Sequence, residues 1–306
     1  MDFDLSRKHL EIQNEAKNLT SRIEPLANEA DELSDIHPTV LTLLRESGLV
    51  ELMVPSKYGG RNDQLDPLSI CLVREIFAGT SCQLDSLFAM QGIGSFAITA
   101  SGSPDQCKKW LPTIRSLDSL AALALTEPDA GSDLKSIITE LHETNDGFRL
   151  SGVKSWISNA GAASFYLVFA RDGEQFTMAI VPADTKGVTV TPCPEIMAPH
   201  VLGEVKFDDV LLPADSIVGD RGTAFDLVLA TLGTFRVSVA GAAVGLADSA
   251  LQEAILHTSR RQQFGRPLAK IGAVEQMLAD CWTEIEMVRL LTYRAAQRAT
   301  VNPLES

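Results

Sequence analysis

Apolar residues recur at helical spacing through the first third of the chain, with charged residues between them. The pattern predicts four helices, over residues 10–26, 38–46, 67–77 and 84–98. A further helix is predicted to start at Ser103, because Ser is a preferred N-cap, Pro104 suits the first helical position, and Gln106 completes a capping box. Residues 1–118 are therefore predicted to form an N-terminal helical domain.

From about residue 119, short runs typical of β-strands replace the helical spacing. These runs cover residues 165–170, 176–181, 188–191 and 205–207. Turn residues separate such runs, at 145–147, 171–173 and 186–187. Residues 119–220 are therefore predicted to form a small antiparallel β-barrel or sandwich.

Helical spacing returns after residue 220. One pattern covers residues 226–259 and contains small residues that permit close helix packing, among them Gly241 and Gly245. A second covers residues 273–299 and carries apolar residues along one face: Met277, Cys281, Ile285, Val288 and Leu291. The chain is predicted to be an α+β multidomain protein, in which residues 221–306 form a C-terminal helical domain.

Composition and charge argue against nucleic-acid binding and against a membrane protein. Of 306 residues, 45% are hydrophobic and 22% charged, as in a soluble globular protein, and the net charge of −14 disfavours nucleic acid and anionic membranes as partners. The apolar stretch 225–247 is interrupted by Asp226 and Arg236, and an Arg inside a membrane span costs about 2.5–3.5 kcal/mol, so a buried helix is predicted instead. Five scattered cysteines and no evident signal peptide indicate a cytoplasmic protein.

Two polar segments are the strongest candidates for chemistry. Residues 125–133 place Thr, Ser, Gly and two Asp around a proline turn, and residues 156–161 follow with an aromatic plane beside a hydroxyl. Such a turn exposes backbone N–H groups and hydroxyls that suit a flat, polar-edged ligand with phosphates or carbonyls. The chain contains no P-loop, no G-x-G-x-x-G, no G-x-S-x-G and no H-E-x-x-H, and its five His do not fall at metal-ligand spacing, so no metal is expected.

Five motifs, in order, resemble the acyl-CoA dehydrogenase family, and the resemblance covers nearly the whole chain. They lie at residues 54–60, 125–133, 156–161, 205–213 and 261–268. The resemblance implies a helical, β and helical domain order, an FAD cofactor, and oxidation of an acyl-CoA or carrier-bound acyl thioester to its α,β-enoyl form. It also implies an electron-acceptor flavoprotein as partner and assembly as a homodimer, homotetramer or hetero-oligomer.

The resemblance assigns roles to individual residues. The implied FAD contacts are Leu125, Thr126, Gly131, Ser132, Trp156, Ile157, Ser158, Arg261, Gln263 and Phe264. Arg261, Gln263 and Phe264 would reach the FAD of a neighbouring subunit, where a forked guanidinium suits the diphosphate. Ser132 and Arg236 would contact substrate. A solvated turn, a core aromatic at Trp156, a solvated helix end at Arg261 and a structural salt bridge at Arg236 are the plainer alternatives.

The catalytic base is not assigned. In most of the family it is a Glu in a segment near the C-terminus that this sequence, ending at Ser306, does not contain. A minority of the family places the Glu one residue before the helix Arg, where this chain has Phe235. Gly233 and Gly272 stand where the family usually has Asp and Gln, which weakens the implied substrate and FAD contacts.

Three interpretations therefore stay open. The sequence is a fragment of an ordinary dehydrogenase, a divergent flavoprotein with base-independent chemistry such as oxygenation or elimination, or a non-catalytic subunit of a hetero-oligomeric dehydrogenase. The first predicts exposed apolar surface on residues 273–299, where further helices would pack.

Overall fold

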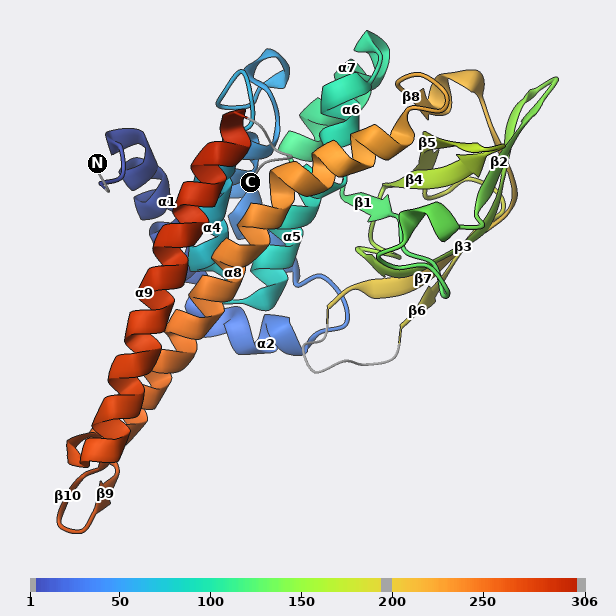
Figure 1. Ribbon diagram of the computed structural model, residues 1–306. Helices are drawn as coiled ribbons and strands as arrows, with labels where there is room; N and C mark the ends of the chain where they lie inside the picture. Colours follow the sequence, from blue (N-terminus) through green and yellow to red (C-terminus); the bar gives the residue numbers. More distant parts are fainter. Residues whose placement is uncertain (1–3, 194–199, 302–306) are drawn as a thin grey trace.

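The computed structural model describes residues 4–193 and 200–301; residues 302–306 of the predicted third domain lie outside this range (Figure 1). The N-terminal part is helical, as predicted. Its helices are α1 (Arg7–Ile23), α2 (Ala27–Glu32), α3 (Pro38–Ser47), α4 (Pro67–Ala78), α5 (Cys82–Ile93), α6 (Phe96–Ser101) and α7 (Pro104–Arg115).

Local sequence signals set several helix ends. The predicted capping box of α7 is present, because Ser103 and Gln106 exchange side-chain and backbone hydrogen bonds. Helix α3 ends at Gly48, which adopts φ 67° as a left-handed cap. The single helix predicted over residues 84–98 is wrong, because α5 and α6 are separated at Gly94. A Cβ on Gly94 would lie 2.7 Å from the Cβ of Ala121, so the chain bends where it passes the first strand.

The middle part is one mixed sheet. Its strands are β1 (Ala121–Ala124), β2 (Glu140–Thr144), β3 (Gly147–Ser158), β4 (Phe165–Asp172), β5 (Gln175–Pro182), β6 (Val188–Pro192), β7 (Leu202–Leu212) and β8 (Ile217–Val218). The order is β6-β7-β3-β2-β4-β5-β8, with β1 beside β4. The purely antiparallel arrangement that was predicted is wrong in one respect: β1 and β2 each pair with β4 in parallel, although β2 also forms an antiparallel hairpin with β3.

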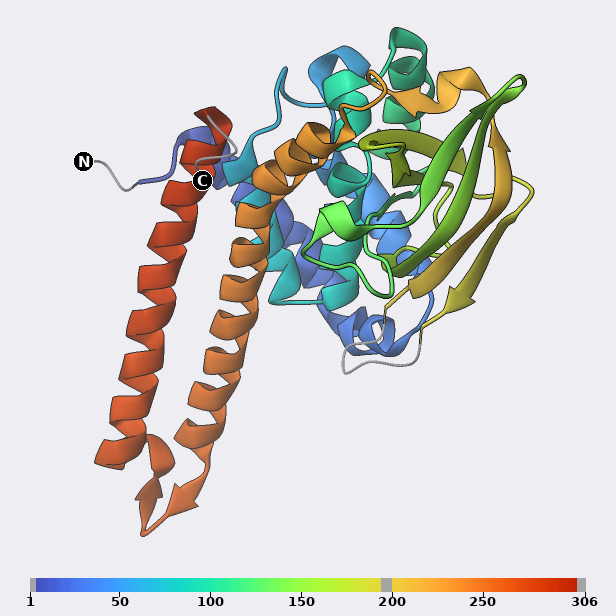
Figure 2. The same cartoon turned by 45° about the vertical axis from the view of Figure 1, so that its right-hand side comes forward.

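The C-terminal part is a long antiparallel helix pair, α8 (Ala224–Arg260) and α9 (Gly272–Val301). A short hairpin, β9 (Gln262–Gln263) and β10 (Arg266–Pro267), joins the helices at the far end. In Figures 1 and 2, α9 lies on the side of α8 away from the sheet, and the hairpin projects beyond the rest of the protein. Helix α8 is long and apolar enough to cross a membrane, but 61% of its apolar window is buried within the protein, as in a core helix.

Helices α4 and α8 approach closely because two glycines of α8 face the backbone of α4. A Cβ on Gly245 would lie 1.8 Å from the carbonyl oxygen of Glu75, and one on Gly241 would lie 2.8 Å from the carbonyl oxygen of Cys71. The small residues noted in the sequence therefore permit the predicted close packing.

We expect Gly245→Ala to lower the free energy of unfolding by about 1–3 kcal/mol, because the added methyl group must push two helix backbones apart. The matched control is Gly272→Ala, since a Cβ there meets nothing within 4 Å. Urea unfolding measures both changes. Equal midpoints for the two variants would contradict the close approach.

Helix α9 exposes a large apolar surface. Its exposed apolar side chains are Met277, Trp282, Met287, Val288, Leu290 and Leu291. Three residues of the predicted apolar face, Met277, Val288 and Leu291, belong to this set. The expectation of exposed apolar surface on residues 273–299 is met.

Candidate functional site

The two polar segments singled out in the sequence lie side by side. The first leaves β1 at Ala124, and the second is the end of β3. The backbone N–H of Ser155 donates a 2.8 Å hydrogen bond to the carbonyl oxygen of Thr126. The turn itself is closed by paired backbone hydrogen bonds between Glu127 and Ala130. Two segments separated in the sequence, 125–133 and 156–161, thus form one surface.

A buried ion pair beneath this surface holds the segments together. The Nζ of Lys154 donates to the carbonyl oxygen of Leu125 at 2.8 Å and to Oε1 of Glu127 at 2.9 Å. The Glu127 carboxylate also accepts hydrogen bonds from the backbone N–H groups of Ile138 and Thr139, at 2.7 and 3.0 Å. The side chains of Lys154 and Glu127 are 0% and 2% exposed.

Burial dominates the titration of Lys154. Desolvation lowers the pKa of its ammonium group to about 8, although Glu127 opposes this shift. Burial alone would raise the pKa of Glu127, but the backbone hydrogen bonds and Lys154 outweigh it and hold this pKa below its usual range. This pair was not predicted from the sequence. The only signal for it is a Lys within a strand, two residues before the segment 156–161.

Trp156 is an exposed aromatic residue in a strained backbone conformation. Its φ is +58°, which non-glycine residues rarely adopt, and 57% of its surface is exposed. It lies at an irregularity in the β3–β7 register between Lys154 and Ile157, where a bulge re-aims a side chain. The alternative of a core aromatic is therefore wrong. By contrast, the side chains of Leu125 and Ile157 are buried, so these two residues offer a ligand only their backbone groups.

Three hydroxyl side chains belong to the same two segments as the exposed indole. The side chains of Thr126, Ser132 and Ser158 make no hydrogen bond to any other residue in the described ranges. Ser132 and Gly131 are exposed, and a Cβ on Gly131 would meet nothing within 4 Å. The surface thus presents an aromatic plane, unengaged donors and open space, which fits a flat heterocycle with polar edges.

The three FAD contacts predicted at the hairpin do not lie at the surface that carries Trp156. Arg261, Gln263 and Phe264 are all exposed, Phe264 to 91%. Lys135, just after the turn, has its Nζ 5.2 Å from the ring centroid of Phe225 in the first turn of α8. The hairpin follows the last turn of the same helix, about 55 Å away at 1.5 Å per residue. One chain therefore cannot bring both groups to one ligand.

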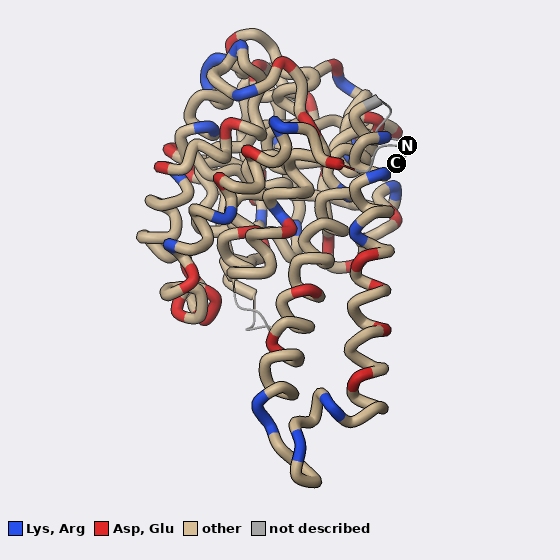
Figure 3. The backbone as a smooth tube through the Cα atoms, turned by 90° about the vertical axis from the view of Figure 1, so that its left-hand side faces the viewer, with Lys and Arg blue, Asp and Glu red and all other residues tan. Residues whose placement is uncertain are grey.

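The hairpin end of the helix pair is basic. Figure 3 shows Lys and Arg there with no Asp or Glu on the hairpin itself. The basic residues are Arg260, Arg261, Arg266 and Lys270. This charge suits a phosphate-bearing ligand.

Arg236 lines a cavity on the same face of α8 as Phe225. The cavity has a volume of about 360 Å³ and is lined by Ile93, Thr231, Leu232, Phe235, Arg236 and Val239. Arg236 is exposed, and its Nε donates to the carbonyl oxygen of Leu232 at 3.2 Å. Within the described ranges it contacts no carboxylate, so the structural salt bridge considered for it is wrong. The buried pair of this region is formed instead by Arg74 and Asp85.

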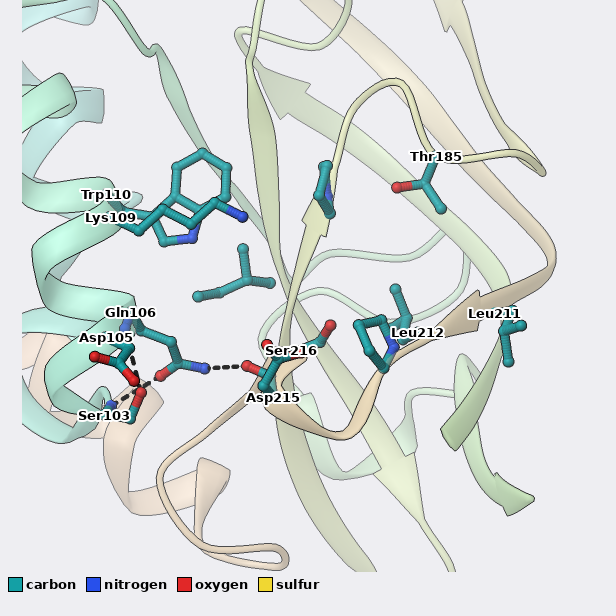
Figure 4. A pocket seen from close by; sticks show the side chains of 13 residues that line it. Ser103, Asp105, Gln106, Lys109, Trp110, Thr185, Leu211, Leu212, Asp215 and Ser216 are labelled. Carbon is teal, nitrogen blue, oxygen red and sulfur yellow. Dashed lines mark hydrogen bonds between the residues drawn. The ribbon is translucent and has the colours of Figure 1, made fainter. Parts of the chain in front are cut away.

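A second cavity lies where α7 meets the sheet (Figure 4). Its volume is about 320 Å³, and Trp110, Lys109 and Pro182 are among its lining residues. Gln106 ties its two sides together by donating to the carbonyl oxygens of Asp215 and Ile217 at 2.7 and 2.8 Å. None of the cofactor or substrate contacts predicted from the sequence is among the described residues that line this cavity.

A helical domain, a mixed β domain with an exposed aromatic residue in β3, and a long helix pair, in this order, form the three-domain architecture of acyl-CoA dehydrogenases. The N-terminal, middle and C-terminal domains of acyl-CoA dehydrogenase match residues 6–118, 122–210 and 222–304. The chain therefore belongs to the acyl-CoA dehydrogenase family.

Similar proteins agree with this assignment. Probable acyl-CoA dehydrogenase FadE25 of Mycobacterium tuberculosis is 33% identical, over 97% of this chain and 78% of its own length. The structure of butyryl-CoA dehydrogenase from Megasphaera elsdenii is 31% identical with a TM-score of 0.91, covering 97% of this chain and 80% of that one. The acyl-CoA dehydrogenase of Bacillus anthracis, solved in complex with FAD, is 27% identical with a TM-score of 0.87, covering 96% and 52%.

Proposed function

We propose that this chain binds FAD on the surface formed by Thr126, Ser132, Trp156 and Ser158, and that it oxidises an acyl-CoA or carrier-bound acyl thioester to the α,β-enoyl thioester. The observation that carries the proposal is the exposed, strained indole of Trp156, in two paired segments whose hydroxyl groups have no partner in the described protein. Bound FAD would supply the hydride acceptor, and the protein would supply binding and orientation.

The hairpin completes the proposed cofactor site in a second subunit. Arg261 and Gln263 would contact the diphosphate and adenine side of a partner's FAD, because they lie too far from the turn of their own chain. Because each cofactor site would then need residues of two subunits, the proposal requires an oligomer. We propose an electron-acceptor flavoprotein as the redox partner and the cytoplasm as the location.

Oxidation of a thioester to its enoyl form needs a base that accepts the α-proton. Among the described residues, those that line the cavity beside Arg236 include no Asp, Glu or His. Removal of the α-proton therefore requires a carboxylate from outside this lining. The same observation favours the second candidate, a flavoprotein of this fold whose chemistry needs no base.

Anaerobic titration with acyl-CoA thioesters tests these candidates. Purified protein with a flavin spectrum that bleaches on addition of a thioester supports the dehydrogenase. A flavin that no thioester bleaches favours base-independent chemistry. Protein that binds no flavin alone, but does so with another subunit, favours the hetero-oligomer.

We expect Trp156→Ala to weaken FAD binding by about 1–3 kcal/mol, the range for truncating an aromatic side chain that stacks on a heterocyclic base. The matched control is Trp282→Ala, since both indoles are 57% exposed but Trp282 lies on α9. Fluorescence titration with FAD measures both affinities. Equal losses in the two variants would remove Trp156 from the cofactor site.

A further inference from the structure

The cavity beside Arg236 has a floor made by one aromatic ring. Phe235 lines it but is only 3% exposed, because its ring points toward the N-terminal domain. There it packs edge-on against Phe96, with ring centroids 5.8 Å apart. The ring therefore stands between the open cavity and the protein core.

The ring of Phe235 packs against the backbone of Gly92, which has no side chain. A Cβ on Gly92 would lie 2.6 and 2.7 Å from two ring carbons of Phe235 and 2.6 Å from the sulfur of Met53. Met53 is itself 1% exposed. The ring therefore packs directly against helix α5 at Gly92.

The walls and rim of the cavity indicate an amphiphilic anion as ligand. Ile93, Leu232 and Val239 contribute apolar walls, and among the described lining residues only Arg236, whose side chain is exposed, carries a charge. An acyl chain suits the walls, and the phosphates of its carrier suit the rim. The face of α8 that carries Leu232 and Arg236 also carries Phe225, which contacts Lys135 beside the turn.

We propose that Phe235 limits the depth of the acyl site, so that the protein selects compact acyl groups and rejects long straight chains. This inference rests on the proposed function. Because the ring lies between the cavity and Gly92, a smaller side chain at position 235 extends the cavity toward Phe96 and Met53.

Calorimetric titration of the oligomer with straight-chain acyl-CoA thioesters, from butyryl to palmitoyl, tests this. Each methylene that enters an apolar cavity strengthens binding about fourfold. In the wild type we expect this gain to stop at a short chain length. In Phe235→Leu the affinity should keep rising for more methylenes than in the wild type, and in Phe235→Ala for more methylenes still. The milder Leu variant keeps the test valid if the Ala variant does not fold.

Phe77→Leu is the matched control, because Phe77 is a fully buried ring of α4 that packs on Phe88, outside the cavity lining. Its chain-length profile should equal that of the wild type. Identical profiles for the wild type and both Phe235 variants would overturn the inference while leaving the proposed function intact. Failure of the wild type to bind any acyl-CoA would overturn the proposed function, and this inference with it.

Discussion

Lys154→Met should lower the free energy of unfolding by about 3–5 kcal/mol, because it leaves the buried carboxylate of Glu127 without its cation. The carbonyl oxygen of Leu125 loses its donor in the same step. Both groups belong to the turn that carries Thr126, so FAD affinity should fall as well, even where the protein stays folded. Urea unfolding and FAD titration at low temperature measure the two effects separately.

Two further variants test whether the unpaired charge of Glu127 causes this loss of stability. Lys154→Met/Glu127→Gln removes both charges and should recover more than half of the lost stability, because the Gln carbonyl oxygen still accepts from a backbone N–H group. Lys206→Met is the control, since Lys206 forms an exposed pair with Asp208 at 3.6 Å that contributes about 0–1 kcal/mol. A Lys154→Met protein as stable as the Lys206→Met protein would show that the buried pair contributes nothing.

Arg74→Met should have a stability effect of similar size but no direct effect on the cofactor. Nε and Nη2 of Arg74 donate to the two carboxylate oxygens of Asp85 at 2.8 and 2.6 Å, and Nη1 donates to Ser238 of α8 at 3.0 Å. Loss of the guanidinium leaves a buried carboxylate unpaired, at a cost of about 3–5 kcal/mol. The hydrogen bond that joins Arg74 of α4 to Ser238 of α8 is lost as well.

The matching double variant, Arg74→Met/Asp85→Leu, should be close to the wild type in stability, because well-packed apolar residues often replace a buried pair without loss. The FAD affinity of folded Arg74→Met should equal that of the wild type. A weaker FAD affinity in this variant would mean that the two domains are coupled more tightly than their contacts suggest.

Much of the fold could be predicted because its helices carry strong local signals. The capping box at Ser103 and the left-handed Gly48 act within a few residues, so the sequence alone reveals them. The break at Gly94 could not be predicted, because its cause is a contact with Ala121. The parallel pairing of β1 with β4 is likewise a property of topology, and the short sequence Ala121–Ala124 shows no alternation.

In the candidate site, too, local motifs could be recognised in the sequence, whereas contacts between distant residues could not. The exposed position of Trp156, and the Ser132 hydroxyl that has no partner among the described residues, are compatible with the motifs, and the roles of these residues stay predictions. The Lys154–Glu127 pair escaped notice because its partners are 27 residues apart and a charged residue in a strand normally indicates a solvated face. The cavity floor at Phe235 depends on Gly92, a contact between distant helices that residue spacing does not reveal.

The length of the helix pair has a consequence for how firmly the cofactor is retained. Helix α8 is about 55 Å long and runs from the region of Lys135, just after the turn at residues 125–133, to the basic hairpin, so each proposed cofactor site draws on two chains. Mass action then links cofactor retention to subunit association, since FAD that binds the assembly more tightly than the separate chains also stabilises the assembly. Dilution should release flavin and subunits together, and added FAD should shift both equilibria back.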